Sequence, residues 1–329
     1  MDDRTCRITP IFLFSLPRSG STLTQRILAT HAEIETVSEP WILLPFLYTR
    51  RRDGVYAEYG HRVAYEAIED FCEGLPGGDE QYLAEIREFT LRLYEWRSHA
   101  NARYFLDKTP RYHLISAEIM RMFSDARFIF LWRNPLAIVA SIIETWGKGR
   151  WNLFEFEIDM FEGLERLVTA YLESPDRAYS VRYEDLTAGG AEAWQKLFEQ
   201  LGLRFDEAQM ARFDGVSLPG RMGDQTGRKA YDALSQEPLD KWKNVLASPL
   251  RKLWCRRYLR WIGEDRLRVM GYESAALLRE LDSIPARPGT VISDVVWMLL
   301  GRGGRLLEPW IIRDKLARLR RRKRLQTHS

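Results

Sequence analysis

The chain has 329 residues, of which 45% are hydrophobic and 29% are charged, and its formal net charge is +3. This apolar fraction is typical of a globular protein with a sizeable core, so the composition excludes a wholly disordered chain, while the length allows one large α/β domain or two smaller ones. The three cysteines (Cys6, Cys72 and Cys255) are far apart and odd in number. They argue against a disulfide framework or a zinc site and favour a reducing compartment.

The charge is concentrated at the C-terminal end. Residues 313–329 contain eight basic residues and one acidic residue, a local net charge of +7, so the rest of the chain carries −4. The apolar stretch at 11–16 is too short for a signal sequence. No stretch reaches the roughly 18 consecutive apolar residues of a membrane-spanning helix. We therefore expect a cytoplasmic protein, or one attached to the cytosolic side of a membrane.

Strands and helices are predicted to alternate along the chain. Residues 11–14 form a continuous apolar run that indicates a buried parallel strand, and a loop and a helix at 22–30 follow it. Further strands are predicted at 34–37, 104–106, 127–132 and 178–183, and further helices at 84–99, 135–146, 191–201 and 240–271. This alternation predicts a three-layer α/β fold with a central, mainly parallel sheet of about five strands. Functional side chains are then expected directly after the strands, because ligands bind at the carboxyl ends of such sheets.

Two later segments interrupt this pattern. Residues 202–236 are glycine-rich and poorly periodic, which predicts a loop region. Pro285 and Pro288 mark a boundary, so we predict a main domain at 1–284 and a C-terminal apolar and basic appendage at 285–329.

The loop after the first strand has the layout of an anion-binding site. Residues 15–22 (SLPRSGST) join a strand to a helix, where backbone N–H groups and the helix dipole favour an anion. The last glycine and the threonine of the Walker pattern GxxxxGK[ST] are present, but Ser15 and Ser21 replace its first glycine and its lysine. The cation is Arg18, whose guanidinium suits an anion smaller than a triphosphate, without an obligatory metal.

This loop resembles the 5′-phosphosulfate loop of sulfotransferases that use PAPS (3′-phosphoadenosine-5′-phosphosulfate). The resemblance implies a P-loop-like fold, with PAPS as co-substrate and PAP as product. It assigns the 5′-phosphosulfate to Pro17, Arg18, Ser19, Gly20, Ser21 and Thr22.

A second motif follows the fourth strand. Arg133 ends that strand and Ser141 lies in the next helix, in the pattern Arg-Asn-Pro-x5-Ser. This pattern resembles the family's 3′-phosphate motif, which implies that both side chains hold the 3′-phosphate. Two weaker resemblances imply that Tyr183 lies near the adenine and that Arg228 or Lys229 reaches the 3′-phosphate from a loop that closes over the nucleotide. From the residues alone, Tyr183 also fits a core position and Arg228 a solvated loop charge.

Transfer of a sulfuryl group requires cations near the leaving oxygen and a base for the acceptor hydroxyl. Lys108 follows the third strand, in a segment (Asp-Lys-Thr-Pro) that resembles the family's catalytic lysine segment. The histidine that cytosolic members carry two residues later is replaced by Pro110, so Glu39 and His113 are the candidate bases. Glu39 is favoured because residues 17–45 resemble tyrosylprotein sulfotransferases, whose base is a glutamate in this segment.

The sequence therefore predicts an enzyme, a PAPS-dependent sulfotransferase that acts on a hydroxyl-bearing acceptor by direct in-line transfer. Arg18, Lys108 and Glu39 are the predicted catalytic residues, and no metal is expected because the histidines lack metal-ligand spacing. One alternative is a P-loop kinase of a nucleoside or small molecule. Another is a catalytically inactive, membrane-associated nucleotide-binding protein.

The C-terminal segment allows three interpretations. Residues 291–300 are apolar and residues 309–324 are rich in arginine. The segment could be a peripheral anchor on anionic lipid, a nucleic-acid arm or a solvated terminus. No aromatic residue interleaves with the arginines, so no nucleic-acid partner is expected, and the other two interpretations stay open.

Overall fold

A computed structural model describes residues 8–222 and 238–307 of the chain. Its central sheet has five parallel strands in the order β2-β3-β1-β4-β5. The strands are β1 (Thr9–Ser15), β2 (Ile34–Thr36), β3 (Tyr104–Asp107), β4 (Arg127–Trp132) and β5 (Ala178–Arg182). This confirms the predicted α/β fold with its parallel sheet of five strands.

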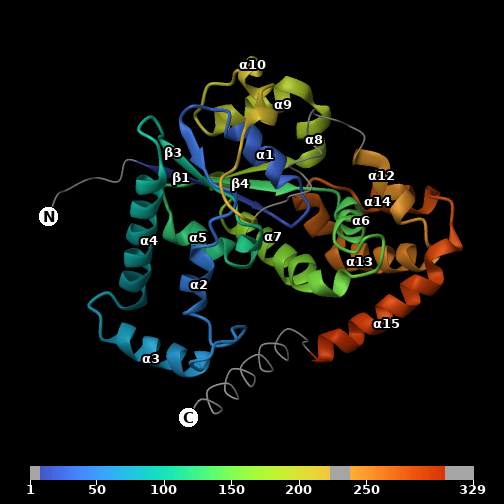
Figure 1. Cartoon of the computed structure of the whole chain (residues 1–329), viewed down its shortest axis with the longest axis horizontal. Coiled ribbons are helices and arrows are strands. Elements are labelled where there is room, and N and C mark those ends of the chain that lie inside the picture. The colour runs from blue at the N-terminus through green and yellow to red at the C-terminus, as the bar shows by residue number, and fades with distance from the viewer. Residues whose placement is uncertain (1–7, 223–237, 308–329) are drawn as a thin grey trace, which may run out of the picture.

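Helices cover both faces of the sheet (Figure 1). One face packs against α1 (Ser21–Leu28), α8 (Tyr183–Ala188), α9 (Gly190–Gln200) and α10 (Glu207–Met210). The other face packs against α2 (Leu43–Tyr48), α4 (Gly78–Arg97), α5 (Ser116–Met122), α6 (Pro135–Thr145), α7 (Leu164–Glu173), α12 (Pro238–Val245), α13 (Pro249–Val269) and α14 (Ser274–Ser283). Outside this second layer, α3 (His61–Glu73) packs on α4, and α15 (Val291–Leu307) packs on α13.

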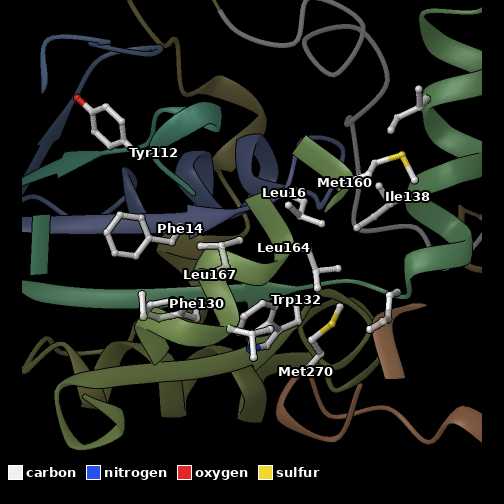
Figure 2. Close-up of a cluster of buried hydrophobic side chains, with 14 of the residues drawn as sticks. Phe14, Leu16, Tyr112, Phe130, Trp132, Ile138, Met160, Leu164, Leu167 and Met270 are labelled. Carbon is white, nitrogen blue, oxygen red and sulfur yellow. The ribbon is translucent and has the colours of Figure 1, made fainter. Parts of the chain in front are cut away.

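The two helical layers explain the continuous apolar run of the first strand. Successive side chains of a strand point to opposite faces, and in β1 they alternate between two separate hydrophobic clusters. Phe14 joins one cluster with Phe130 and Trp132 of β4, and Leu164 and Leu167 of α7 cover them (Figure 2). Apolar side chains therefore cover both faces of the sheet at β1 and β4.

The start of α6 follows the predicted capping pattern. The Asn134 side chain accepts a hydrogen bond of 2.9 Å from the Leu136 backbone N–H, and Pro135 occupies the first turn. This cap fixes the direction of α6 immediately after β4. Arg133 is thereby held at the sheet edge, and Ser141 lies two turns into the helix.

One predicted helical segment differs from the observed helices. The single helix predicted at 240–271 is divided into α12 and α13, because Pro249 has no backbone N–H and starts a new helix after Ser248. The helix α15 runs through the glycines at 301, 303 and 304 and ends at Leu307. A Cβ atom at Gly301 would lie 2.5 Å from the Phe154 ring, so this glycine serves close packing.

The structure also bears on the cysteines and on helices that could cross a membrane. Cys72 and Cys255 are both buried and have free thiols. In the part of the chain that the structure describes, no helix is long and apolar enough to cross a membrane.

Candidate active site

The predicted functional residues meet at one edge of the sheet. Lys108 directly follows β3, Arg133 follows β4, Tyr183 follows β5, and Glu39 lies three residues beyond the end of β2. The loop at 16–20 follows β1 in the same way. Since all the strand pairs are parallel, their carboxyl ends share this edge.

The loop after β1 has a conformation suited to an anion. Arg18 and Gly20 have φ angles of 65° and 87°, in the left-handed region, so the backbone turns sharply before α1. Gly20 is the N-cap of α1 and supplies no side-chain hydrogen bond to its first turn. The first N–H groups of the helix can therefore serve an anionic ligand.

Tyr183 lies against this loop. A Cβ atom at Gly20 would be 2.2 Å from Cδ2 of the Tyr183 ring, so both the backbone angle and the packing require glycine at this position. The guanidinium of Arg133 lies 4.6 Å from the centroid of the same ring, within the range of a cation–π contact. Residues that follow β1, β4 and β5 thus form one packed unit.

Arg18 connects the two predicted phosphate motifs. The Nη1 group of Arg133 donates a 2.6 Å hydrogen bond to the backbone carbonyl of Arg18. The Arg18 side chain donates to the hydroxyls of Ser141 and Thr145, at 3.1 Å each, and lies 5.3 Å from the centroid of the Trp146 ring. The sequence assigned Arg18 to the 5′-phosphosulfate, whereas the structure places its guanidinium against the serine assigned to the 3′-phosphate.

Lys108 and Glu39 form a buried ion pair. The distance from Lys108 Nζ to Glu39 Oε1 is 2.9 Å, and the two side chains are only 2% and 7% exposed. The other carboxylate oxygen of Glu39 accepts a 2.9 Å hydrogen bond from the Trp41 indole N–H. A buried ion pair costs desolvation energy and gives little net stability. Such a pair at the carboxyl edge of a parallel sheet is therefore typical of a functional site.

A network that the sequence analysis did not identify supports this pair. Asp107 is fully buried, and its carboxyl accepts hydrogen bonds from the hydroxyls of Tyr94 (2.5 Å), Tyr112 (3.1 Å) and Thr109 (3.0 Å). The Thr109 hydroxyl in turn accepts a 3.2 Å hydrogen bond from the Trp41 backbone N–H. Burial raises the pKa of Asp107 to about 6, although these hydrogen bonds and Lys108 oppose the shift. The network connects the segment that carries Glu39 to the segment that carries Lys108.

His113, the other candidate base, lies in a different environment. It is fully buried, and its Nδ1 atom forms a hydrogen bond with the Pro110 carbonyl. Its Nε2 atom lies 3.1 Å from Asp159 Oδ1, and its ring packs so closely on Gly163 that a Cβ atom there would overlap it. These contacts are those of a core histidine.

Arg228 lies outside the described residues, so its assignment stays a prediction. The last residues described before it lie next to Glu39. The Ser38 backbone N–H donates a 2.9 Å hydrogen bond to the Pro219 carbonyl, and the Ser38 hydroxyl donates to the Met222 carbonyl.

The site has the donors that a nucleotide with phosphate groups would need. Within residues 8–222 and 238–307, the buried Ser19 hydroxyl and the Nε group of Arg133 have no hydrogen-bond partner. Buried polar groups normally have partners, so both atoms are suited to an anionic ligand at this position. Together with the loop backbone and the Ser141 hydroxyl, they form a set of polar groups suited to anionic groups such as phosphates. The same described residues contain no cluster of three or more His, Cys, Asp or Glu side chains that could hold a metal ion.

Comparisons with known proteins agree with this geometry. The model of the sulfotransferase family matches residues 10–207. Nodulation protein NoeE of Sinorhizobium fredii (strain NBRC 101917 / NGR234) is 34% identical over 137 residues, which cover 41% of this chain and 31% of that protein. Protein-tyrosine sulfotransferase 2 of Gallus gallus is 22% identical over 246 residues, which cover 70% of this chain and 62% of that protein.

A solved structure shares the fold. The sulfotransferase domain from the curacin biosynthetic pathway has a TM-score of 0.50 and 21% identity, covering 72% of this chain and 91% of that one. The matched region spans about a third of the nodulation protein, and less than two thirds of the Gallus gallus protein. The family match covers more than half of the chain, from β1 to the start of α10. It includes the loop at 16–20 (called the phosphate loop below), Glu39, Lys108, Arg133 and Tyr183. The chain belongs to the sulfotransferase family.

Proposed function

We propose that the protein transfers a sulfuryl group from PAPS to a hydroxyl of an acceptor molecule and releases PAP. The observation that carries the proposal is that two groups of residues lie at the same edge of the sheet. One is the anion-binding loop locked to Arg133, and the other is the buried pair of Lys108 and Glu39. The first suits a nucleotide with two separate phosphate positions, and the second suits proton removal beside a cation.

The nucleotide-binding roles follow from the donors of each element. We assign the 5′-phosphosulfate to the backbone N–H groups at the start of α1 and to the Ser19 hydroxyl, and the 3′-phosphate to Arg133 and Ser141. The backbone carbonyl of Arg18 accepts a hydrogen bond from Arg133, and the Arg18 side chain donates one to the Ser141 hydroxyl. We therefore assign it to nucleotide binding, between the two phosphate positions. Tyr183 supports the loop by packing on Gly20.

The catalytic roles follow from the buried ion pair. PAPS supplies the activated sulfuryl group. A bond from the acceptor oxygen to sulfur forms while the bond from sulfur to the 5′-phosphate oxygen breaks, and the hydroxyl proton passes to Glu39. The Lys108 ammonium stabilises the negative charge that develops on the leaving oxygen. The Trp41 indole fixes the orientation of the Glu39 carboxylate by binding its second oxygen.

The direct test measures transfer of radioactive sulfur from labelled PAPS to a panel of hydroxyl acceptors, comprising saccharides, tyrosine peptides, phenols and lipid alcohols. A tyrosine peptide belongs in the panel because the similar Gallus gallus protein is a protein-tyrosine sulfotransferase. We expect Glu39→Gln to lower kcat by a factor of about 10² to 10⁴ while the affinity for PAP is retained. Glu35→Gln, on β2 of the same segment, serves as the matched control and should keep wild-type turnover.

Three results would contradict the proposal or one of its residue assignments. Tight PAP binding without transfer to any acceptor class would indicate an inactive nucleotide-binding protein. Transfer of phosphate from ATP in the presence of Mg²⁺ would indicate a kinase, the other function considered from the sequence. Wild-type turnover in Glu39→Gln would remove this residue as the base.

A further inference from the structure

The outward side of α15 carries a row of exposed apolar side chains. Ile292, Val296 and Leu299 are 82%, 47% and 61% exposed, and Val295 and Leu300 beside them are 42% and 57% exposed. Positions separated by three, four and seven residues lie on one side of a helix. These five residues are called the α15 apolar face. Single exposed hydrophobic residues are ordinary, but a continuous row on one helix marks an interaction surface.

The opposite side of α15 is firmly attached to the body of the protein. Asp294 is fully buried and accepts hydrogen bonds from Arg251 and Ser248 of the α13 start, at 2.7 Å each. Gly301 packs directly on Phe154. Figure 1 shows α15 on the outside of the molecule, beyond α13. The helix is therefore held with its apolar face outward, and that face does not result from loose packing.

Basic residues follow α15 in the sequence. The segment at 313–329, with its local net charge of +7, begins six residues after the end of α15. In the described part, Lys148 is exposed, and the Arg150 guanidinium lies 5.3 Å from the centroid of the Trp297 ring of α15.

We propose that the α15 apolar face and the basic segment after it bind the surface of a membrane that contains anionic lipids. An apolar helix face inserts at the headgroup boundary, and adjacent lysines and arginines are attracted to anionic headgroups. A second copy of the chain is a less favourable partner for the α15 apolar face than a membrane surface. Two apolar faces in contact would bring two segments of charge +7 near each other, and their repulsion would oppose the contact.

Membrane binding would also orient the candidate active site. Arg251, which holds α15 through Asp294, donates a further 2.8 Å hydrogen bond to the Gly149 carbonyl. Gly149 lies just beyond the end of α6, the helix that carries Ser141. The sheet edge with its site is thus fixed relative to the docked helix. This inference does not depend on the reaction that the site performs.

Co-sedimentation of the full chain with lipid vesicles tests the proposal. One set of vesicles is phosphatidylcholine alone, and the other is equal parts phosphatidylcholine and phosphatidylglycerol. We expect at least about tenfold stronger partitioning onto the anionic vesicles, and weaker binding as salt is added. The double variant Ile292→Ser/Leu299→Ser should lose at least about tenfold of this binding, because it removes apolar surface that inserts at the interface.

Matched variants separate the sources of binding. Val63→Ser removes a side chain that is 69% exposed on α3 and should leave vesicle binding unchanged. Replacing the five basic residues at 320–324 by glutamine should weaken binding to anionic vesicles only. Equal binding to both vesicle types, or full binding by the double variant, would overturn the proposal. The proposal would also be overturned if the wild-type protein showed no vesicle binding, formed a dimer, and lost that dimer in the double variant. The α15 apolar face would then bind a second copy of the chain.

Discussion

Asp107 explains how the ion pair of Lys108 and Glu39 is held in place. It precedes Lys108 in the chain. Its carboxyl is fully buried and accepts hydrogen bonds from three hydroxyl groups. Thr109 extends this network to Trp41, which contacts the Glu39 carboxylate. The position of the Glu39 carboxylate, the proposed base, therefore depends on the Asp107 carboxyl, which we expect to have no direct contact with the acceptor.

The raised pKa of Asp107 leads to a prediction about stability. Its folded-state pKa of about 6 exceeds the ordinary value of 3.8, so the folded state binds this proton more strongly than the unfolded state does. The resulting stabilisation is complete only well below the unfolded pKa of 3.8 and is lost as the pH rises through 6, a total change of about 3 kcal/mol. In Asp107→Asn this titration is absent. The difference in free energy of unfolding between wild type and variant should therefore shift by most of this amount, about 2 kcal/mol, between pH 4 and pH 7.

Urea unfolding of both proteins at several pH values measures this difference, and contributions from all other groups cancel in it. Parallel stability curves for the two proteins would contradict the raised pKa of Asp107.

The sequence could place the candidate residues but could not orient their side chains. Lys108, Glu39 and Arg133 each follow a predicted strand, and parallel strands end at one edge, so their proximity was predictable. The contact of Arg18 with Ser141 depends on side-chain torsions and on residues more than a hundred positions away. The inward direction of Asp107 has one local signal, since strand alternation places it on the same face as the buried Phe105.

Among the elements, the turn between β1 and α1 sets the strictest requirement on the sequence. Gly20 combines a φ of 87° with direct contact to the Tyr183 ring. We expect Gly20→Ala to destabilise the fold by about 1–3 kcal/mol and to weaken PAP binding at least about tenfold, because the added methyl group displaces the ring that packs on Arg133. Thermal unfolding and calorimetric titration with PAP measure the two effects.

Gly54→Ala is the matched control for this substitution. Gly54 has a φ of 90°, but its added Cβ atom would meet Tyr48 at an ordinary 3.7 Å. This control carries the same backbone strain without the overlap, so it should lose stability and keep PAP affinity. Equal PAP affinity in Gly20→Ala and Gly54→Ala would show that the Tyr183 contact does not support the phosphate loop.

The element boundaries show which local signals are reliable. The start of α6 was predictable because Asn134 and Pro135 form a capping pattern that depends only on neighbouring residues. The continuation of α15 through its glycines was not predictable, because Gly301 is required by the distant Phe154. Pro249 was a local signal for the division between α12 and α13, and the periodicity on both sides concealed it.

For the whole molecule, the parallel sheet joins segments that are far apart in the sequence. Alternate residues of β1 and β4 enter two separate hydrophobic clusters, so the apolar runs of the sequence already indicated a sheet covered on both faces. The strand order β2-β3-β1-β4-β5 does not follow from these runs. It brings the loop after β1 between Lys108 and Arg133, since β1 lies between β3 and β4. The predicted domain boundary at residue 285 stays a prediction.

The central claim is that the phosphate loop and Arg133 together bind a nucleotide with a 3′-phosphate. Calorimetric titration with PAP, AMP and ATP in the presence of EDTA tests it most directly. Arg127→Ala is the control for Arg133→Ala, because Arg127 is exposed at the opposite end of the same strand. We predict micromolar affinity for PAP, much weaker binding of AMP, and loss of PAP binding in Arg133→Ala but not in Arg127→Ala. ATP binding equal to or stronger than PAP binding, or a strict requirement for Mg²⁺, would contradict the account.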